Sequence, residues 1–286
     1  MSLKVIYRGH LTDCNYSCEY CPFSKEMNNE EMQTLDKNDL ARFVEWVEKN
    51  SSAEMPMEIF FTPYGEALVR KWYQEAIISL SHMPFVIKVA AQTNLAWNQK
   101  WLSRCNTKTT ALWITYHPDF ISEDKFVEKC NAIKALNIRH SVGVVGLRQH
   151  FPMIASLRQR LPQETYLWVN AYKREANYYT DTEIDFLEDI DFLFKQNLPW
   201  YDSLGKPCKA GDEVVSVEGN GNLFRCHFIK IKKGNIFEDP LVNLLKKEPC
   251  SKASCHCHIG YIYLNHLKSD EVYGNGLLER IPIQYG

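Results

Sequence analysis

Residues 3–21 read LKVIYRGHLTDCNYSCEYC, an apolar run followed closely by three cysteines. The apolar run predicts a β-strand from Leu3 to Arg8. The cysteines Cys14, Cys18 and Cys21 have the spacing C-x3-C-x-Tyr-C, which places three thiols on one short loop after this strand. Three thiolates on one loop can hold three corners of a [4Fe–4S] cube and leave the fourth iron open to a substrate or cofactor.

The composition is that of a globular protein. The 286 residues are 45% hydrophobic and 24% charged, with a net charge of −2. This balance disfavours a broadly basic nucleic-acid-binding protein. No apolar run approaches the ~18 residues of a membrane span, and the start of the chain lacks the apolar stretch of a signal peptide. We therefore expect a cytoplasmic protein without nucleic-acid or membrane partners.

The remaining cysteines need a separate interpretation. The chain has ten cysteines, and clustered thiols in a reducing compartment are more often metal or cluster ligands than disulfides. Zinc at the first group would need a fourth ligand, and the closest histidine, His10, lies on the strand side of the loop. Cys105 and Cys130 stand alone, and we expect both to pack in the core.

The spacing C-x3-C-x-aromatic-C after a first strand resembles the signature of the radical S-adenosylmethionine (SAM) superfamily, with Tyr20 in the aromatic position. The resemblance implies that Cys14, Cys18 and Cys21 hold a catalytic [4Fe–4S] cluster whose open iron binds SAM. It also implies that an electron, from a flavodoxin- or ferredoxin-type reductant, cleaves SAM to a 5′-deoxyadenosyl radical. That radical would abstract a hydrogen atom from the substrate.

Strand and helix patterns alternate as far as residue 195 and predict six β/α repeats. The strands are near-continuous apolar runs, typical of a parallel sheet covered by helices. Six repeats match the partial (β/α)6 TIM-like barrel of radical SAM enzymes, whose chemistry lies at the C-terminal strand ends. The later strands are predicted at 57–62, 85–92, 111–116, 139–145 and 166–171, and helices at 36–49 (capped by Asp36), 67–80, 98–104, 122–136 (capped by Ser122), 152–160 and 181–195.

The resemblance assigns residues at these strand ends to SAM. Tyr64-Gly65-Glu66 is similar to the Gly-Gly-Glu stretch of the family, with Tyr64 in place of the first glycine. The alternative is a turn with an acid at a helix N-terminus. The residues implied in cofactor binding are Tyr20, Gly65, Glu66, Thr93, Asn94, Thr115, His117, Gly143 and Val145.

Each further strand end also has a structural alternative. Thr93-Asn94 resembles Thr-Asn-Gly, with Leu95 in place of glycine, and is otherwise a turn. His117 is otherwise an ordinary loop residue before Pro118. Glycine on the fifth strand would let the backbone approach the adenine, or mark a bulge. Asn170 and Tyr172, at the end of the sixth strand, are candidates for facing the substrate.

The β/α pattern stops near residue 196, and we predict two domains, 1–196 for the partial barrel and 197–286 for a small cysteine-rich β-hairpin and helix domain. Gly219-Asn220-Gly221, between predicted strands 214–218 and 223–225, indicates a hairpin, and a helix is predicted near 240–247. This pattern resembles the twitch form of the SPASM extension, which binds auxiliary [4Fe–4S] clusters. The candidate ligands are Cys208, Cys226, Cys250, Cys255 and Cys257.

Five thiols are one more than a single auxiliary cluster needs. We expect Cys208, Cys226 and Cys255 as ligands, with Cys250 and Cys257 as alternatives for the fourth place. A tetrahedral zinc site that includes nearby histidines is the alternative, with His227, His256 and His258 as candidates.

The leading hypothesis is a radical SAM enzyme that dehydrogenates or cross-links a small molecule, with the auxiliary cluster assisting electron transfer. Because the first strand begins at residue 3, we expect no N-terminal leader-binding module, which favours a small molecule over a ribosomally made peptide. Peptide modification by the same chemistry is the first alternative. A non-catalytic cluster- or zinc-binding scaffold is the second, and the imperfect matches at Tyr64 and Leu95 are its support.

Overall fold

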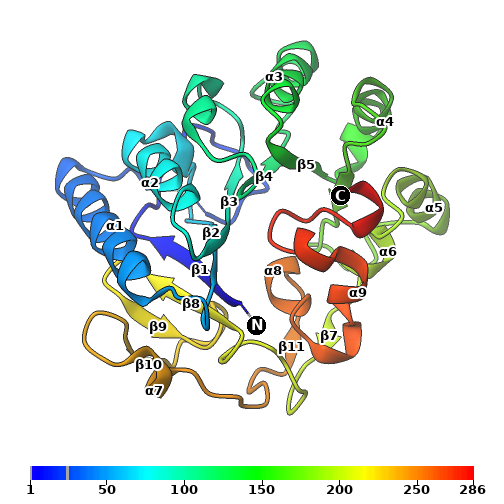
Figure 1. Ribbon diagram of the computed structural model, residues 1–286. Coiled ribbons are helices and arrows are strands. Elements are labelled where there is room, and N and C mark those ends of the chain that lie inside the picture. The colour runs from blue at the N-terminus through cyan, green and yellow to red at the C-terminus, as the bar shows by residue number, and fades with distance from the viewer. Residues whose placement is uncertain (1, 24–25) are drawn as a thin grey trace.

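The computed structural model describes residues 2–23 and 26–286. One nine-stranded sheet has the order β10-β9-β8-β1-β2-β3-β4-β5-β6 (Figure 1). Its strands β1 to β6 are all parallel and follow one another in chain order, as the six predicted β/α repeats require. Their bounds are β1 Leu3–Gly9, β2 Met57–Phe61, β3 Val86–Thr93, β4 Thr110–Thr115, β5 Arg139–Val145 and β6 Leu167–Asn170.

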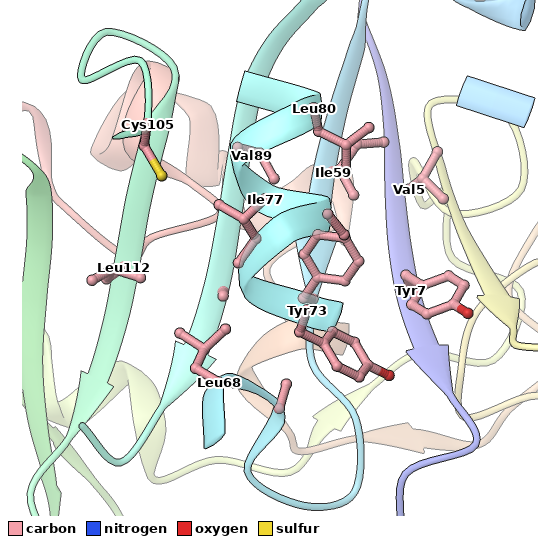
Figure 2. Packing of buried hydrophobic residues seen from close by; sticks show 14 of the residues in the cluster. Val5, Tyr7, Ile59, Leu68, Tyr73, Ile77, Leu80, Val89, Cys105 and Leu112 are labelled. Atoms are coloured by element: carbon pink, nitrogen blue, oxygen red, sulfur yellow. The ribbon is translucent and has the colours of Figure 1, made fainter. Parts of the chain in front are cut away.

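Helices cover the outer face of these strands (Figure 1). They are α1 Glu30–Asn50, α2 Lys71–Ser81, α3 Glu123–Ala135, α4 Phe151–Arg160 and α5 Asp181–Ile190, with short 3-10 turns at Ala67–Val69, Gln99–Arg104 and Arg148–His150. Figure 2 shows side chains of α2 packed against outward-facing residues of β1 to β4. Side chains alternate along each strand, so Val5 and Tyr7 join this outer core whereas Ile6 faces the interior. Cys105 and Cys130 lie in the outer core, as predicted.

The predicted start and cap of the first helix were wrong. The helix α1 begins at Glu30, because the Asn29 side chain accepts a hydrogen bond from the Met32 amide (2.8 Å) and so caps the first turn. Asp36 lies inside the helix and is buried. Its carboxylate accepts hydrogen bonds from the His10 amide (2.9 Å) and the Trp72 indole (2.8 Å), which connects α1 to the cysteine loop and to α2.

The helix predicted over 181–195 is interrupted at Asp191. The helix α5 ends at Ile190, and a short helix α6 spans Phe194–Asn197. The Asp191 carboxylate accepts hydrogen bonds from the Val169 amide on β6 (2.8 Å) and from the Leu193 amide (3.0 Å). These two contacts draw the backbone toward the sheet, which a helical pattern in the sequence does not reveal.

The predicted hairpin is confirmed, but it continues the main sheet. The strands β8 Val214–Glu218 and β9 Asn222–Phe224 pair antiparallel, and Gly221 has a φ of +83° at the turn. Strand β8 also pairs in parallel with β1, and β10 Lys232–Asn235 completes that edge. The helix expected near 240–247 is shorter, α7 Leu241–Leu244, and β7 Tyr201–Asp202 pairs with β11 Ser254–Cys255.

The C-terminal segment fills the inner side of the sheet. It contains α8 His258–Tyr261, α9 Ser269–Tyr273 and 3-10 turns at Asn265–Leu267, Gly274–Gly276 and Ile283–Tyr285. Its apolar residues, such as Tyr261 and Leu278, pack against the inward-facing side chains Phe60, Trp113 and Trp168. Figure 1 shows α8 and α9, in orange to red, on the side opposite the outer helices. No helix in the part of the chain that the structure describes has the length and apolar character needed to cross a membrane.

A buried ion pair holds this segment in place. The Lys88 ammonium on β3 contacts the Glu279 carboxylate at 2.5 Å, and both side chains are almost fully buried. Arg139 on β5 lies 3.4 Å from the same carboxylate, and Ser141 donates to the Glu279 carbonyl oxygen at 2.6 Å. Glu279 therefore connects the C-terminal segment to two strands.

We expect Lys88→Met to lower the free energy of unfolding by about 3–5 kcal/mol, because it removes the closer of the two cations beside the buried Glu279 carboxylate and leaves Arg139 at 3.4 Å. Lys134→Met is the matched control, because the ion pair of Lys134 with Glu164 is exposed and its loss should cost less than about 1 kcal/mol. Urea denaturation of both variants measures the difference. Equal losses would show that the Glu279 contact does not hold the segment.

Candidate functional site

The first three cysteines lie on a loop that begins where β1 ends. The Asn28 side chain accepts hydrogen bonds from the Thr12 and Asp13 amides (2.9 and 3.0 Å), and the Asp13 carboxylate pairs with Arg70 at 2.6 Å. Gly65, after β2, passes so close beneath the loop that a Cβ there would lie 1.6 Å from the Asp13 carbonyl oxygen. Only glycine fits this contact, so Gly65 positions the cysteine loop.

The thiols of Cys14, Cys18 and Cys21 are close enough that their charges influence one another's pKa values. Burial raises the pKa of Cys14 to about 11, and the charges of Cys18 and Cys21 act in the same direction. Burial also raises the pKa of Cys18, and Cys21 again acts in the same direction. Binding to iron reverses this preference, because a metal ion deprotonates a coordinating thiol. The donor set of three neighbouring thiols on one loop fits the cluster that the resemblance implies.

Tyr20 and His117 lie directly beside the thiol of Cys18. The Tyr20 hydroxyl lies 2.7 Å from His117 Nδ1, and the Cys18 sulfur lies 3.3 Å from the same nitrogen. Burial lowers the pKa of His117 to about 4, so its ring is neutral at neutral pH. Nδ1 of the neutral ring, the Tyr20 hydroxyl and the Cys18 sulfur therefore form one hydrogen-bonded group without a charge on the imidazole. The structure brings together two residues that lie far apart in the sequence and that we predicted for SAM binding.

Asn94, at the end of β3, also contacts the cysteine loop. Its side-chain amide donates to the Asn15 side chain (3.0 Å) and lies 3.6 Å from the Cys14 sulfur. The hydroxyl of the preceding residue, Thr93, donates to one oxygen of the Glu66 carboxylate at 2.7 Å. The backbone N–H of Asn94 donates to the other oxygen at 2.5 Å. Leu95 follows with a φ of +62°, a left-handed conformation that favours glycine.

Glu66 is buried at the centre of this arrangement. Besides Thr93 and Asn94, its carboxylate accepts from the Leu68 amide (3.0 Å) and caps the 3-10 turn after β2. This is the helix-terminal acid that we gave as the alternative interpretation of the Tyr64-Gly65-Glu66 stretch. Burial raises the pKa of Glu66 to about 7, although the three hydrogen bonds act in the opposite direction.

The raised pKa predicts a pH-dependent stability. An unfolded Glu66 ionises near its ordinary pKa of 4.5, whereas the folded residue keeps its proton up to about pH 7. Across this window the unfolded chain binds fewer protons, so the contribution of Glu66 to the free energy of unfolding falls as pH rises, by at most about 3 kcal/mol.

The glutamine of Glu66→Gln cannot ionise, and its NH2 group would face the hydrogen-bond donors Thr93, Asn94 and Leu68. We therefore expect this variant to be less stable than the wild type at pH 5. The gap between the two proteins should narrow by pH 8. Urea denaturation at both pH values measures the gap, because every other titrating group is shared. A gap independent of pH would contradict the assigned ionisation.

The remaining predicted SAM residues lie at the ends of β4 and β5. The Thr115 hydroxyl is buried and has no hydrogen-bond partner within residues 2–23 and 26–286, which leaves it available to a ligand. Val145 is half-buried and pairs with Asn170. Gly143 has another role, because a Cβ there would lie 2.0 Å from the Trp168 ring. The absence of a side chain at Gly143 makes room for the inward-facing indole of Trp168. The alternative of a β-bulge does not apply, because β5 pairs with β4 and β6 in regular register through Gly143.

Four of the five C-terminal cysteines act on one another. The thiol of Cys226 is influenced by Cys208 and Cys250, and the thiol of Cys255 is influenced by all three. Burial raises the pKa of Cys226 to about 11 and that of Cys255 to about 12. Gly260 permits the approach of Cys255, since a Cβ there would lie 2.7 Å from its sulfur.

Cys257 has different surroundings. It also acts on Cys255, but the charges that act on its own thiol are those of Arg8, Lys173 and Arg280. These cations come from β1, from the segment after β6 and from the C-terminal segment. The thiol of Cys257 is therefore set apart by the cations that act on it, whereas its packing against the inner core cluster is shared with Cys208 and Cys255.

Arg225 connects the cysteine loops and was missed by the sequence interpretation. Its buried guanidinium donates to the carbonyl oxygens of Ala210 (3.0 Å), Pro249 (3.0 Å) and Glu248 (2.5 Å). These acceptors lie within two residues of Cys208 or Cys250 in the sequence, and Arg225 itself directly precedes Cys226. Its position directly before the candidate ligand Cys226 is the one sign of this role in the sequence. The carbonyl oxygens that it contacts are determined by the tertiary structure.

Two of the three histidines near these cysteines contact side chains other than the thiols. His256 stacks on Trp200 with ring centroids 3.9 Å apart, and His258 Nδ1 lies 3.2 Å from the Tyr261 hydroxyl. The Nδ1 atom of His227 has no partner among the described residues, and burial lowers the pKa of His227 to about 3. Over the same residues, no three His, Cys, Asp or Glu side chains are grouped closely enough to hold a single metal ion.

The fold is similar to that of solved structures of anSMEcpe. Native anSMEcpe with bound AdoMet (S-adenosylmethionine) and Cp18Cys peptide is 14% identical, covers 98% of this chain and 88% of that chain, and has a TM-score of 0.58. Native anSMEcpe with bound AdoMet and Kp18Cys peptide is 13% identical, covers 86% of this chain and 81% of that chain, and has a TM-score of 0.59. The expected partial barrel is thus confirmed. No protein-family model and no curated protein matches the chain.

Proposed function

We propose that this chain, whose fold is that of the AdoMet-bound anSMEcpe structures, is a radical SAM enzyme that abstracts a hydrogen atom from a small-molecule substrate. The observation that carries the proposal is the group of three thiols, Cys14, Cys18 and Cys21, on the loop after β1. When bound, a [4Fe–4S] cluster and SAM supply reductive cleavage to methionine and a 5′-deoxyadenosyl radical. A flavodoxin- or ferredoxin-type protein is the proposed reductant.

The residues around the loop have separable roles in this proposal. Gly65 and Asn94 position the loop, since one lies beneath Asp13 and the other contacts Cys14. His117 and Tyr20 lie beside Cys18, whose side chain is buried. Glu66, Thr93, Thr115 and Val145 are assigned to SAM by the resemblance, and the unpaired hydroxyl of Thr115 supports this assignment for that residue.

We further propose that Cys208, Cys226, Cys250 and Cys255 hold one auxiliary [4Fe–4S] cluster. Their mutual electrostatic influence and the contacts of Arg225 support this choice. Four thiolates complete the coordination of a cube, which suits transfer of an electron rather than direct binding of a substrate. Cys257 is left over and lies near the cations of the barrel interior.

A peptide substrate is the second candidate. The observation that favours it is that the similar anSMEcpe structures contain bound Kp18Cys and Cp18Cys peptides. The C-terminal segment packed against the inner face of the sheet favours the small molecule, because it occupies space that a larger substrate would need.

The test is anaerobic reconstitution with iron and sulfide, followed by addition of SAM and dithionite. We expect 5′-deoxyadenosine, measured by chromatography, from the reconstituted protein and none from protein without iron. A reduced and fully assembled cluster that forms no 5′-deoxyadenosine would instead support the non-catalytic scaffold.

A further inference from the structure

Arg280 is a buried cation without a hydrogen-bonded partner in the part of the chain that the structure describes. Its side chain is 0% exposed, and Nε, Nη1 and Nη2 all lack an acceptor. The Tyr273 hydroxyl approaches the guanidinium without the geometry of a full hydrogen bond. An unpaired buried guanidinium is unfavourable, so we look for its acceptors outside the described residues.

Asp191, the carboxylate that acts electrostatically on Arg280, does not supply the missing hydrogen-bond acceptor. Asp191 acts on Arg280 electrostatically, but its carboxylate accepts hydrogen bonds from the Tyr166 hydroxyl (2.5 Å), the Val169 amide (2.8 Å) and the Leu193 amide (3.0 Å). Asp191 therefore offsets part of the charge from a distance. The hydrogen-bonding capacity of the guanidinium stays free.

Two other buried polar atoms close to Arg280 also lack partners among the described residues. They are Trp113 Nε1 and His258 Nε2. The guanidinium carbon lies 5.6 Å from the Trp113 ring centroid and 4.4 Å from that of Trp168, and the rings of Trp113 and His258 are 5.2 Å apart. The three residues therefore form one group inside the barrel, lined by indole rings.

The proton positions in this group follow from its hydrogen bonds. The Tyr261 hydroxyl donates to the Asn197 side-chain oxygen (2.8 Å), so it must accept from His258 Nδ1 (3.2 Å). His258 then carries its proton on Nδ1 and presents a lone pair on Nε2. The group thus offers several donors, from Arg280 and Trp113, and one acceptor, from His258.

We propose that Arg280, Trp113 and His258 form a binding subsite for a small carboxylate that also carries a hydroxyl or amino group. A guanidinium binds a carboxylate through two parallel hydrogen bonds, and His258 Nε2 accepts from the hydroxyl or amino group. That this ligand is the substrate rests on the proposed function. The binding subsite itself rests only on the unpaired atoms.

The backbone also holds Arg280 at this place. The neighbouring Glu279 is fixed by Lys88 and Ser141, and Arg280 has a left-handed φ of +56°, which is uncommon for a residue other than glycine. Lys173 and Cys257, nearer the strand ends, both lie within electrostatic influence of Arg280. Arg280 therefore directly follows the Glu279 contact in the chain and is close enough to Lys173 and Cys257 to influence their pKa values.

The test is calorimetric titration of the anaerobically reconstituted holoenzyme with four probes: glycolate, acetate, ethylene glycol and inorganic phosphate. We expect saturable binding of glycolate, weaker binding of acetate and phosphate, and none of ethylene glycol. Arg280→Met should weaken glycolate binding about tenfold to a hundredfold, the effect of losing a charged hydrogen-bonded contact. Arg104→Met, which removes an exposed arginine, is the control and should bind glycolate as the wild type does.

A second variant keeps the test decisive if Arg280→Met fails to fold. His258→Phe removes the acceptor but keeps a ring against Trp113, so it should weaken glycolate binding and leave acetate binding unchanged. Unaltered glycolate binding in Arg280→Met, equal effects on both probes in His258→Phe, or tighter binding of phosphate than of glycolate would overturn the proposal. Formation of 5′-deoxyadenosine from SAM and dithionite without any probe is measured separately. Its absence in the wild type would overturn the radical SAM function but not the subsite.

Discussion

Cys18→Ala should reduce the formation of 5′-deoxyadenosine below detection and remove about half of the iron of the reconstituted protein. Cys18 is the buried member of the N-terminal group and lies beside His117. Its loss leaves two thiols on the loop, too few to hold a cube on three corners. Chromatography of the SAM products and iron analysis measure the two effects.

The matched control is Cys130→Ala. Cys130 is a buried thiol of the outer core, on α3 and away from both cysteine groups. We expect this variant to keep its iron and its SAM cleavage, with a loss of stability from the removed packing. If Cys18→Ala retained full SAM cleavage, the N-terminal loop would not be the catalytic site.

The second large effect concerns the auxiliary cluster. Cys226→Ala should lose the other half of the iron and stop turnover of the substrate, while cleavage of SAM stays measurable. The thiol of Cys226 is influenced by Cys208 and Cys250, so its removal opens the cluster that we assign to these residues. Iron analysis and electron paramagnetic resonance of the reduced protein distinguish the two clusters.

A pair of variants decides the fourth ligand. Cys250→Ala should behave like Cys226→Ala, because both thiols belong to the same electrostatic group. Cys257→Ala should keep all of its iron, because its thiol lies instead among Arg8, Lys173 and Arg280. The opposite result, with iron lost only from Cys257→Ala, would exchange the two residues in our assignment.

Much of the fold could be predicted from local patterns. Apolar runs gave all six parallel strands β1 to β6 to within one residue at each end, because burial on both faces of a parallel sheet leaves a local signal in each strand. The Asn220-Gly221 pair also predicted the β8–β9 hairpin locally, because a tight turn requires a residue with positive φ and glycine supplies it at Gly221. Spacing alone also grouped Cys14, Cys18 and Cys21 on one loop.

Features that depend on contacts between distant segments could not be predicted. Asp36 has the sequence signature of a cap, yet it is buried within α1 because His10 and Trp72 donate to it. Arg225 and Arg280 resemble ordinary arginines in the sequence. Their roles arise because the chain brings carbonyl oxygens to one and indole rings to the other.

The sequence by itself therefore determined where the six strands lie along the chain and which loop carries three thiols, because apolar runs and cysteine spacing are properties of neighbouring residues. Only the tertiary structure decided that β8 extends the sheet beside β1, that the thiol of Cys255 lies within electrostatic reach of the other four C-terminal thiols, and that Arg280 is buried without a hydrogen-bonded partner among the described residues. The physical reason is that pairing, burial and charge at these places depend on side chains separated by up to the whole length of the chain.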